Sequence, residues 1–251
     1  MRPRIRQARI AELVQKQRQV TVDDLAVRFD TSHETIRRDL SALAEAGTVQ
    51  KFHGGARLPR DGAEGPFRER MAQNAAAKRA IAAKAAALFS PGQTLFIDTG
   101  STTLMCAQEL AKVSGLTVVT NASRIAETMA SADNRSSVFL LGGRFDGDNR
   151  ETVGPTTIEQ IASFRADYAV ITVGALDSRE GAMDFNFDEA QIARAMIDNA
   201  GEAVVLADST KFGRKGSFRV CPLERIQTLV TDKPPGPEMQ KVLAAAKTTV
   251  R

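Results

Sequence analysis

The chain has few of the residues that build disulfides, metal sites and aromatic clusters. Its 251 residues include two cysteines, two histidines, one tyrosine and no tryptophan. Two cysteines cannot form the disulfide framework of a small secreted protein. With only two histidines beside them, the chain offers few ligands for a zinc site. We therefore expect no metal and no cofactor, and we expect Cys106 to pack as a small apolar side chain.

Long apolar runs are missing too. No stretch approaches the roughly 20 apolar residues that a helix needs to cross a bilayer. The basic N-terminus, MRPRIRQARI, is followed by neither an apolar segment nor a small-residue cleavage site, so we identify no secretion signal. With 43% hydrophobic and 25% charged residues, the composition is typical of a globular protein. The sequence predicts a cytoplasmic protein with one large domain, or with a small and a medium one.

Positive charge is concentrated in the first quarter of the chain. Residues 1–60 hold 12 Lys and Arg against 7 Asp and Glu, whereas the remaining residues hold 22 against 23. A localised excess of cations indicates a polyanionic partner, with DNA or RNA as the first candidates. Chance variation in a small domain is the alternative, and charge alone does not separate the two.

The apolar periodicity of residues 1–58 predicts three short helices and a hairpin. The first helix has an apolar face formed by Ile10, Leu13 and Val14. Thr21 is placed to cap a second helix that runs to about Phe29. A third helix follows a short break and runs from about residue 32 to residue 46, where Gly47 is a natural stop.

The third helix has two distinct faces. Its apolar positions recur at i, i+4 and i+7: Ile36, Leu40 and Leu43. Its opposite face carries Glu34, Arg37, Arg38 and Ser41. With a helix and a short turn before it, this segment fits a helix-turn-helix, whose second helix enters the DNA major groove. Arginine suits that role because its planar fork donates two hydrogen bonds to a guanine edge or a phosphate.

A hairpin after the third helix is predicted to form a wing. Its two strand-like runs, TVQKF and ARL, flank glycines that suit a tight reversal. The expected DNA-contacting residues of helix and wing are Ser32, His33, Glu34, Thr35, Arg37, Arg38, Ser41, Lys51, His53, Gly54 and Gly55. The alternative is an amphipathic helix with a solvated charged face. The short turn, the paired arginines and the Gly-Gly wing together favour the DNA-binding interpretation.

Residues 20–56 resemble a known family of regulators. The string TIRRDL followed by HGGA is specific to the winged helix-turn-helix of the DeoR family of bacterial sugar-metabolism regulators. Thr31 stands where that family usually has Val, and Lys51 stands where it usually has Arg. Neither difference undermines DNA binding. The resemblance implies a transcriptional regulator that binds double-stranded operator DNA.

The second part of the chain alternates apolar strands with amphipathic helices. An Ala-rich helix over about 76–89 follows a Pro- and Gly-containing linker, 59–75. Strands are expected at 94–98, 116–121, 137–141, 168–174, 202–208 and 228–232. Helices are expected at about 102–113, 123–132, 155–162, 188–199 and 237–246. The alternation predicts an α/β domain over 76–251 with a doubly wound, mainly parallel sheet.

The loop after the first of these strands is typical of an anion site at a helix N-terminus. Its run of small and hydroxyl residues, 98–103, lets backbone N–H groups surround a phosphate. Ligands of open α/β sheets bind at the carboxyl ends of strands, where other polar and glycine residues also occur. The expected ligand-contacting residues are Asp98, Gly100, Ser101, Thr102, Thr103, Asn121, Gly142, Gly143, Gly174, Asp184, Glu189 and Lys211.

Within that set, the roles differ. Lys211 would provide the positive charge for a phosphate, while Asp184, Glu189 and their neighbour Asp188 suit sugar hydroxyls. Each residue has a plain structural alternative. An Asp-Thr-Gly turn is often only a helix cap, and Lys211 would serve equally as a solvated surface lysine.

Residues 76–251 also resemble the DeoR-type sensor domain. The matching strings are LFIDTGSTT, VVTN, LLGG, VG at 153–154, DFNFDEAQIAR and VLADSTKFGR. That sensor is similar to sugar-phosphate isomerases of the ribose-phosphate-isomerase type, and its effectors are phosphorylated sugars or polyols. DFNFDE and DSTKFGR look most like the glycerol-3-phosphate repressors, whereas GRFDGDNRETVG departs from them. The resemblance implies a repressor of a sugar or polyol catabolic operon that a phosphorylated metabolite releases from DNA.

Two other function classes remain open at this point. Carboxylates at Asp98, Asp184 and Glu189 with Lys211 suit acid–base chemistry, so a sugar-phosphate isomerase with a DNA-binding appendage is one alternative. An interaction protein with a degenerate pocket is the other. No P-loop, HExxH or G-x-S-x-G string is present. We rank the non-enzymatic repressor first, and we expect it to self-associate as a dimer or tetramer through the larger domain, because helix-turn-helix proteins usually bind two half-sites.

Overall fold

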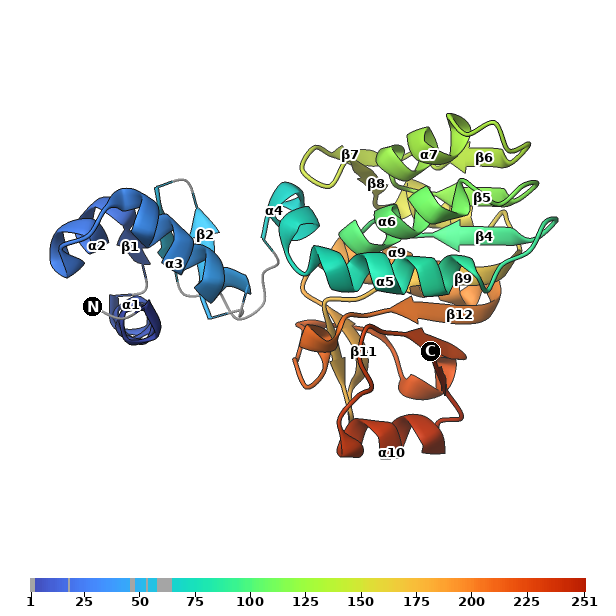
Figure 1. The fold of residues 1–251 in the computed structure, drawn as a ribbon. Helices are drawn as coiled ribbons and strands as arrows, with labels where there is room; N and C mark the ends of the chain where they lie inside the picture. Colours follow the sequence, from blue (N-terminus) through green and yellow to red (C-terminus); the bar gives the residue numbers. More distant parts are fainter. Residues whose placement is uncertain (1–2, 18, 46–47, 53, 58–64) are drawn as a thin grey trace. The chain divides into compact units, whose positions relative to one another are not determined.

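The computed structural model describes residues 3–17, 19–45, 48–52, 54–57 and 65–251 (Figure 1). The chain divides into two compact units, Met1–Gly65 and Pro66–Arg251. We call these the N-terminal unit and the C-terminal unit. Among the described residues, no helix is long and apolar enough to span a membrane.

The N-terminal unit contains the three expected helices and the hairpin. Its elements are α1 (Pro3–Gln17), β1 (Gln19–Thr21), α2 (Val22–Phe29), α3 (His33–Glu45), β2 (Gln50–Phe52) and β3 (Gly55–Arg57). The strands form an antiparallel sheet in the order β1-β3-β2, so β1 adds a strand that the sequence did not predict. The Thr21 hydroxyl accepts the N–H of Asp24 at 3.1 Å, which confirms the expected cap. The expected stop at Gly47 lies outside the described residues.

Apolar side chains from all three helices meet in one small core. Its largest fully buried members are Ile10, Leu25, Ile36 and Leu40. Between α2 and α3 the chain turns at Asp30, whose backbone is left-handed at φ 46°. This tight turn is what lets the buried stripes of α2 and α3 face each other.

The expected linker at 59–75 is wrong in its second half. Residues 59–64 lie outside the described residues, but α4 (Phe67–Ala72) and α5 (Ala75–Ala86) form the start of the C-terminal unit. Phe67 is buried in the core of that unit. Because α4 has six residues, it is too short for an apolar period to reveal it from sequence.

The C-terminal unit is built on a seven-stranded sheet. Its strands are β4 (Thr94–Ile97), β5 (Thr117–Thr120), β6 (Ser137–Leu140), β9 (Ala166–Thr172), β12 (Ala200–Leu206), β14 (Thr228–Val230) and β15 (Thr249–Val250). Their order is β15-β14-β12-β9-β4-β5-β6, and every neighbouring pair is parallel. This confirms the predicted doubly wound sheet. The order of connection reverses between β4 and β9, where such sheets form a crevice at the carboxyl ends of the strands.

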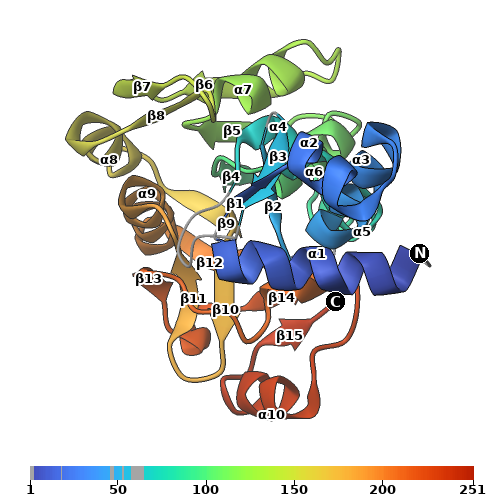
Figure 2. The same cartoon turned by 90° about the vertical axis from the view of Figure 1, so that its left-hand side faces the viewer.

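Helices cover both faces of the sheet. The helices that complete the unit are α6 (Ser101–Leu110), α7 (Ser123–Ala130), α8 (Pro155–Ile161), α9 (Phe187–Asp198) and α10 (Pro237–Ala245). Figure 2 shows α5 and α6 on one side of the strands and α8 and α9 on the other. Each face has its own apolar core, and apolar residues of α10 belong to the same core as those of α9.

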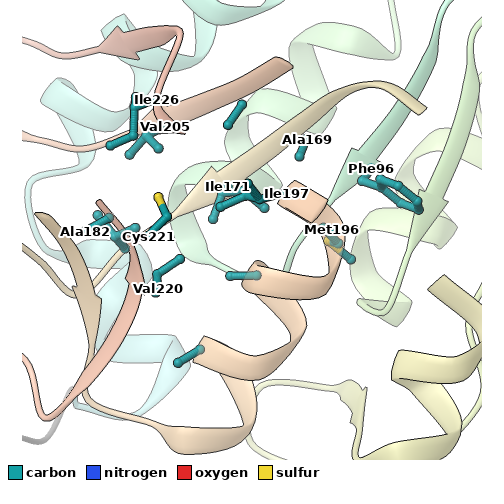
Figure 3. Close-up of a cluster of buried hydrophobic side chains, with 14 of the residues drawn as sticks. Phe96, Ala169, Ile171, Ala182, Met196, Ile197, Val205, Val220, Cys221 and Ile226 are labelled. Carbon is teal, nitrogen blue, oxygen red and sulfur yellow. The ribbon is translucent and has the colours of Figure 1, made fainter. Parts of the chain in front are cut away.

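The core beneath α9 shows how the helix and sheet pack (Figure 3). Phe96 of β4 and Ile171 of β9 are fully buried, and Met196 of α9 packs in the same cluster. On the other face Cys106 is also fully buried, as expected from the sequence. Burial raises the pKa of its thiol to about 12, because the thiolate would lose its hydration.

Several short strands were not predicted. They are β7 (Arg144–Asp146), β8 (Glu151–Val153), β10 (Ala175–Asp177), β11 (Gly181–Asp184) and β13 (Phe218–Cys221), with the 3-10 turns η1 (Ser209–Lys211) and η2 (Leu223–Arg225). β7 and β8 form a hairpin, and β10, β11 and β13 form a small antiparallel sheet. At three or four residues each, these strands are too short for alternation to be distinguished from a loop.

Candidate functional site

The exposed face of α3 has the properties of a nucleic-acid-binding helix. Ser32 caps it, since its hydroxyl accepts the Thr35 N–H at 3.2 Å. Arg37 and Arg38 are exposed on the same face. Arg38 donates to Glu34 at 3.3 Å, one turn earlier. Because such an exposed pair contributes little to stability, the arginine is available to a stronger polyanionic partner.

A buried ion pair holds α3 against α1. Arg6 donates to the Asp39 carboxylate, and Gln7 donates to the other oxygen of Asp39 at 3.0 Å. Asp39 is only 3% exposed, although it follows directly after the two exposed arginines. Sequence analysis missed this residue, because an Asp in a charged run has no signal that distinguishes it from its solvated neighbours.

The wing approaches α3 through Lys51. Its ammonium donates to the Ser41 hydroxyl of α3 at 2.8 Å, so these two predicted DNA-contacting residues are neighbours. Gly54 has φ +89°, and a Cβ on Gly55 would lie 2.2 Å from the Val20 carbonyl oxygen. Both positions therefore require glycine. His53, also predicted to contact DNA, lies outside the described residues.

The 98–103 loop lies at the point where the sheet order reverses. It leads from β4 into α6, whose N-terminus has no side-chain cap. A Cβ on Gly100 would lie 2.2 Å from Thr172 Cγ2, so the close approach of this loop to β9 requires glycine. Ser101, Thr102 and Thr103 are all buried, and their helix start presents backbone N–H groups that favour an anion.

Sequence analysis missed two buried cations in this part of the C-terminal unit, and one of them contacts the helix start directly. Lys78 of α5 is 6% exposed and donates to the Ser101 hydroxyl at 2.8 Å. It also donates to the backbone carbonyl of Arg70. Arg70 of α4 is 8% exposed and donates to the Asn149 side chain. In the sequence these residues stand in an Ala-rich helix and a supposed linker, so no local signal distinguished them.

Carboxylates surround the same loop. Asp98 is 6% exposed, and both of its oxygens accept the Thr172 N–H at 3.0 and 3.1 Å. Burial raises the pKa of Asp98 well above its usual range, and the charges of Glu189 and Asp184 raise it further. Burial also raises the pKa of Glu151, against the opposing effect of its hydrogen bonds. Among the described residues, no group of acidic, His and Cys side chains is arranged to hold a metal ion.

Two asparagines join Glu151 and Glu189 into one network. Asn149 donates to Glu151 at 2.9 Å and to Glu189 at 3.0 Å. Asn121 donates to the other oxygen of Glu151 at 3.0 Å. The network therefore connects two predicted ligand residues, Asn121 after β5 and Glu189 in the first turn of α9, to Arg70, which donates to Asn149.

The other predicted ligand residues have visible structural contacts. The Gly142 N–H donates to Gln160 at 2.9 Å, and a Cβ on Gly143 would lie 2.1 Å from the Thr157 hydroxyl, so both glycines pack against α8. A Cβ on Gly174 would lie 2.8 Å from the Phe185 ring, which lets the segment after β11 approach β9. The carboxylate of Asp184 accepts the N–H groups of the next two residues.

Lys211 is half-buried at the end of η1, beyond β12. The start of α5 reaches the same region, because Asn74 donates to Asp208 at 3.4 Å. The Asp208 carboxylate accepts the Thr210 N–H at 3.0 Å and caps η1. Thus α5 contacts the polar segments that follow both β4 and β12. Asp188, the neighbour of Glu189 that was also expected to suit sugar hydroxyls, forms an ion pair with Arg144 instead.

Comparisons with known proteins agree with this arrangement. Residues 6–61 match the DeoR-like helix-turn-helix domain, and residues 73–233 match the DeoR C terminal sensor domain. The glycerol-3-phosphate regulon repressor of Escherichia coli (strain K12) is 34% identical over 235 residues, which cover 93% of this chain and 92% of that protein.

Two solved structures align with this chain. A chain of the tetrameric eIF2B-beta2-delta2 complex from C. thermophilum aligns with a TM-score of 0.50 at 13% identity, covering 94% of this chain and 86% of that one. Ribose 5-phosphate isomerase A from Methanocaldococcus jannaschii aligns with a TM-score of 0.42 at 16% identity, covering 57% and 56%. At 13% identity the likeness to the first of these structures concerns the fold alone. From the matches to both of its domains, the chain belongs to the DeoR family.

Proposed function

We propose that this protein is a DNA-binding transcriptional repressor of sugar or polyol catabolic genes, released from its operator by a phosphorylated metabolite. The observation that carries the proposal is the buried Lys78 ammonium, 2.8 Å from the Ser101 hydroxyl at an uncapped helix start. Burying a cation is unfavourable unless strong partners compensate. A buried cation at a helix N-terminus therefore favours an anionic ligand.

The effector that fits this site has a phosphate and hydroxyl groups. We place the phosphate over the start of α6, with Lys78 and Arg70 as its counter-charges. The carboxylates of Asp98, Asp184 and Glu189 would then accept hydrogen bonds from the hydroxyl groups. The Escherichia coli relative is named for glycerol 3-phosphate, so glycerol 3-phosphate or a sugar phosphate is the proposed effector. The further proposed ligand residues are Gly100, Ser101, Thr102, Thr103, Asn121, Gly142, Gly143, Gly174 and Lys211.

On the DNA side, α3 is the proposed recognition helix and the hairpin β2–β3 the proposed wing. The first turn of α3 and its arginines face solvent, whereas the opposite stripe is buried in the core. This is the division that insertion into a major groove requires. We propose that the protein acts by binding and not by catalysis, since its relatives are named as regulators.

The proposal is tested by titrating DNA binding with effector. The duplex is selected with the full-length protein from a randomised pool, and its Kd is measured with and without glycerol 3-phosphate and a panel of sugar phosphates. We expect a saturating effector to weaken DNA binding by roughly 5- to 150-fold. Glycerol and inorganic phosphate together serve as the unlinked control. A parent protein whose DNA affinity responds to no phosphorylated ligand would contradict the proposal, and conversion of a sugar phosphate in the same incubation would favour the isomerase alternative.

A matched pair of variants locates the phosphate. Lys78→Ala removes the buried cation, and loss of a charge-assisted hydrogen bond of about 1.5–3 kcal/mol should weaken effector binding roughly 10- to 150-fold. Lys84→Ala is the control, because Lys84 lies on the same helix and donates to the Thr231 carbonyl at 2.8 Å instead. Equal effector affinities for the two variants would place the phosphate elsewhere.

We also propose that a second copy of the chain covers the free edge of the sheet. β6 is the last strand in the order, and it exposes Phe139 at 46% and Leu140 at 52%. Phe145 on β7 is 55% exposed. Exposed apolar edge strands are usually protected by charges or by a partner, and binding of two half-sites requires a dimer. Light scattering at micromolar concentration should show a dimer or tetramer for the parent and a smaller species for Leu140→Glu; a monomeric parent would contradict this.

A further inference from the structure

The helix α4 is the first element of the C-terminal unit, so the chain from the N-terminal unit enters at its start. With six residues it is too short to be stable alone, because isolated helices of this length are marginal in water. Its position must therefore come from its contacts with the rest of the unit. Those contacts fall into two groups, one at each end of the helix.

The first group anchors Phe67. This side chain is 4% exposed, and the guanidinium carbon of Arg124 on α7 lies 4.1 Å from the centroid of its ring. The Phe67 N–H donates to the Asp148 carboxylate at 3.2 Å, in the turn between β7 and β8. Arg124 also donates to the backbone carbonyl of Asp148 at 3.4 Å. The ring, the cation above it and the turn thus hold the start of α4 together.

The second group joins α4 to the ligand site. The Lys78 ammonium donates both to the Ser101 hydroxyl and to the carbonyl of Arg70. The Arg70 side chain donates to Asn149, which is bound in turn to Glu189. Lys78 therefore contacts both α4 and the loop where the phosphate is proposed to bind, and Arg70 links α4 to the Asn149 network.

A phosphate at Ser101 would compete for these donors. An ammonium has three N–H donors, and an anionic oxygen accepts them more strongly than a hydroxyl or a carbonyl does. Ligand binding would therefore alter the contact of Lys78 with the Arg70 carbonyl of α4. A ligand shifts an equilibrium only if it prefers one of two arrangements, and donors shared between ligand and helix supply that preference.

We propose that α4 passes effector occupancy to the chain that leads to the DNA-binding unit, and that Phe67 and Arg124 are its positioning residues. The inference rests on the proposed function, since it requires an anionic effector at Ser101. Loosening the Phe67 anchor would let Lys78 and Arg70 respond to the ligand without moving the start of α4. Effector binding would then persist while its effect on DNA affinity declined.

The test measures the coupling factor, which is the ratio of the DNA Kd with and without saturating glycerol 3-phosphate, for full-length variants. Phe67→Leu keeps the apolar bulk but removes the aromatic face, and its coupling factor should fall at least about fivefold, toward one. Phe89→Leu is the matched control, because Phe89 is 5% exposed and packs edge-on against Tyr168 at the opposite end of the strands. Its coupling factor should stay within about twofold of the parent value.

Two substitutions at Arg124 keep the test decisive if Phe67→Leu folds poorly. Arg124→Gln removes the closer of the two cations above the Phe67 ring, since Arg124 lies 4.1 Å and Arg70 5.4 Å from its centroid. It should also lower the coupling factor, whereas Arg124→Lys retains the charge and should restore it. In all four variants the Kd for glycerol 3-phosphate should stay within about fivefold of the parent, which distinguishes lost coupling from a lost site. A merely structural role would not separate Arg124→Gln from Arg124→Lys.

Hydrogen exchange of the parent protein provides a measurement that needs no variant. Adding glycerol 3-phosphate should change amide exchange in residues 66–73, and it should leave residues 86–93, at the other end of α5, unchanged. Parental coupling in both Phe67→Leu and Arg124→Gln, or unchanged exchange in 66–73, would overturn the role of α4 while leaving the proposed function intact. If neither glycerol 3-phosphate nor any sugar phosphate changed the DNA Kd of the parent protein, the proposed function would instead be overturned, and this inference with it.

Discussion

The two units use cationic side chains in opposite ways. In the N-terminal unit Arg37 and Arg38 are exposed on a helix, whereas in the C-terminal unit Arg70 and Lys78 are 8% and 6% exposed. Exposed cations suit a large polyanion, because binding to it releases the counterions condensed along its phosphates. Buried cations suit a small anion that enters a preformed site, because the low dielectric there strengthens every charge-assisted contact. Burial, more than residue type, distinguishes the two kinds of partner.

The buried ion pair of Arg6 and Asp39 is the exception to this contrast, because Arg6 is a cation of the N-terminal unit that is only 8% exposed. The largest expected effect comes from its partner, Asp39. It is the buried carboxylate of the N-terminal unit, and removing one partner of a buried ion pair typically costs about 3–5 kcal/mol. Asp39→Ala should therefore unfold the N-terminal unit first and leave the other unit intact. Tyr168 is the single tyrosine and the chain has no tryptophan, so tyrosine fluorescence reports the C-terminal unit alone. Circular dichroism should thus show an early transition that fluorescence does not.

The control for Asp39→Ala is Glu12→Ala, which removes the same charge from an exposed position on α1. It should change the free energy of unfolding by less than about 0.5 kcal/mol. If both probes shifted together in Asp39→Ala, the two units would unfold as one, and the division between them would not extend to stability.

Ser101→Asp tests the buried anion site of the C-terminal unit. It places a carboxylate at the start of α6, beside Lys78, where the phosphate of the effector is proposed to lie. Effector affinity should fall by roughly 10- to 150-fold, the loss of about 1.5–3 kcal/mol expected for a charge-assisted contact, while DNA binding persists. Ser101→Ala removes only the hydroxyl and should show a smaller loss. Calorimetric titration with glycerol 3-phosphate measures the effector affinity of both variants. An affinity of Ser101→Asp equal to that of the parent would show that the phosphate does not bind at this loop.

Arg37→Ala and Arg38→Ala test the exposed arginines of α3 as DNA contacts. Loss of a base contact should cost about 1–3 kcal/mol and relax specificity at one base pair. Loss of a phosphate contact should instead weaken all duplexes alike and reduce the slope of log K against log salt by about 0.9. Lys112→Ala, which removes an exposed cation from the C-terminal unit, is the control. Parent-like fluorescence anisotropy for both arginine variants would exclude α3 as the recognition helix.

Asp98 gives the smallest expected effect and tests burial directly. Burial, Glu189 and Asp184 raise its pKa, so the folded state binds its proton more tightly than the unfolded chain does. The contribution of Asp98 to stability therefore falls as pH rises above the unfolded value of about 3.9, up to the raised folded pKa. Asp98→Asn removes this titration, so the Tm of this variant should rise relative to that of the parent as the pH is raised above about 3.9. A Tm difference that did not vary with pH would mean that Asp98 does not titrate in this range.

Sequence reasoning succeeded where the controlling interactions are local. The faces of α3, the Thr21 cap and the alternation of strands and helices all depend on residues within a few positions of one another. The 98–103 loop was proposed as an anion site for the same kind of local reason, since its glycine and hydroxyl residues adjoin in the chain, and its role in ligand binding stays a prediction. The short strands β7, β8, β10, β11 and β13 escaped it, because three or four residues do not establish a period.

Tertiary structure decided which charged residues are buried and therefore how each is used. Lys78 in an Ala-rich helix and Arg70 in a supposed linker resemble solvated lysines and arginines until α5 and α4 pack beside Ser101. Asp39 likewise becomes a buried partner of Arg6 only when α1 and α3 meet. The amino-acid sequence by itself determined the helix and strand periods, because those follow from local backbone geometry. The environment of a charge depends on water being excluded by segments far apart in the chain, and only the folded structure brings those segments together.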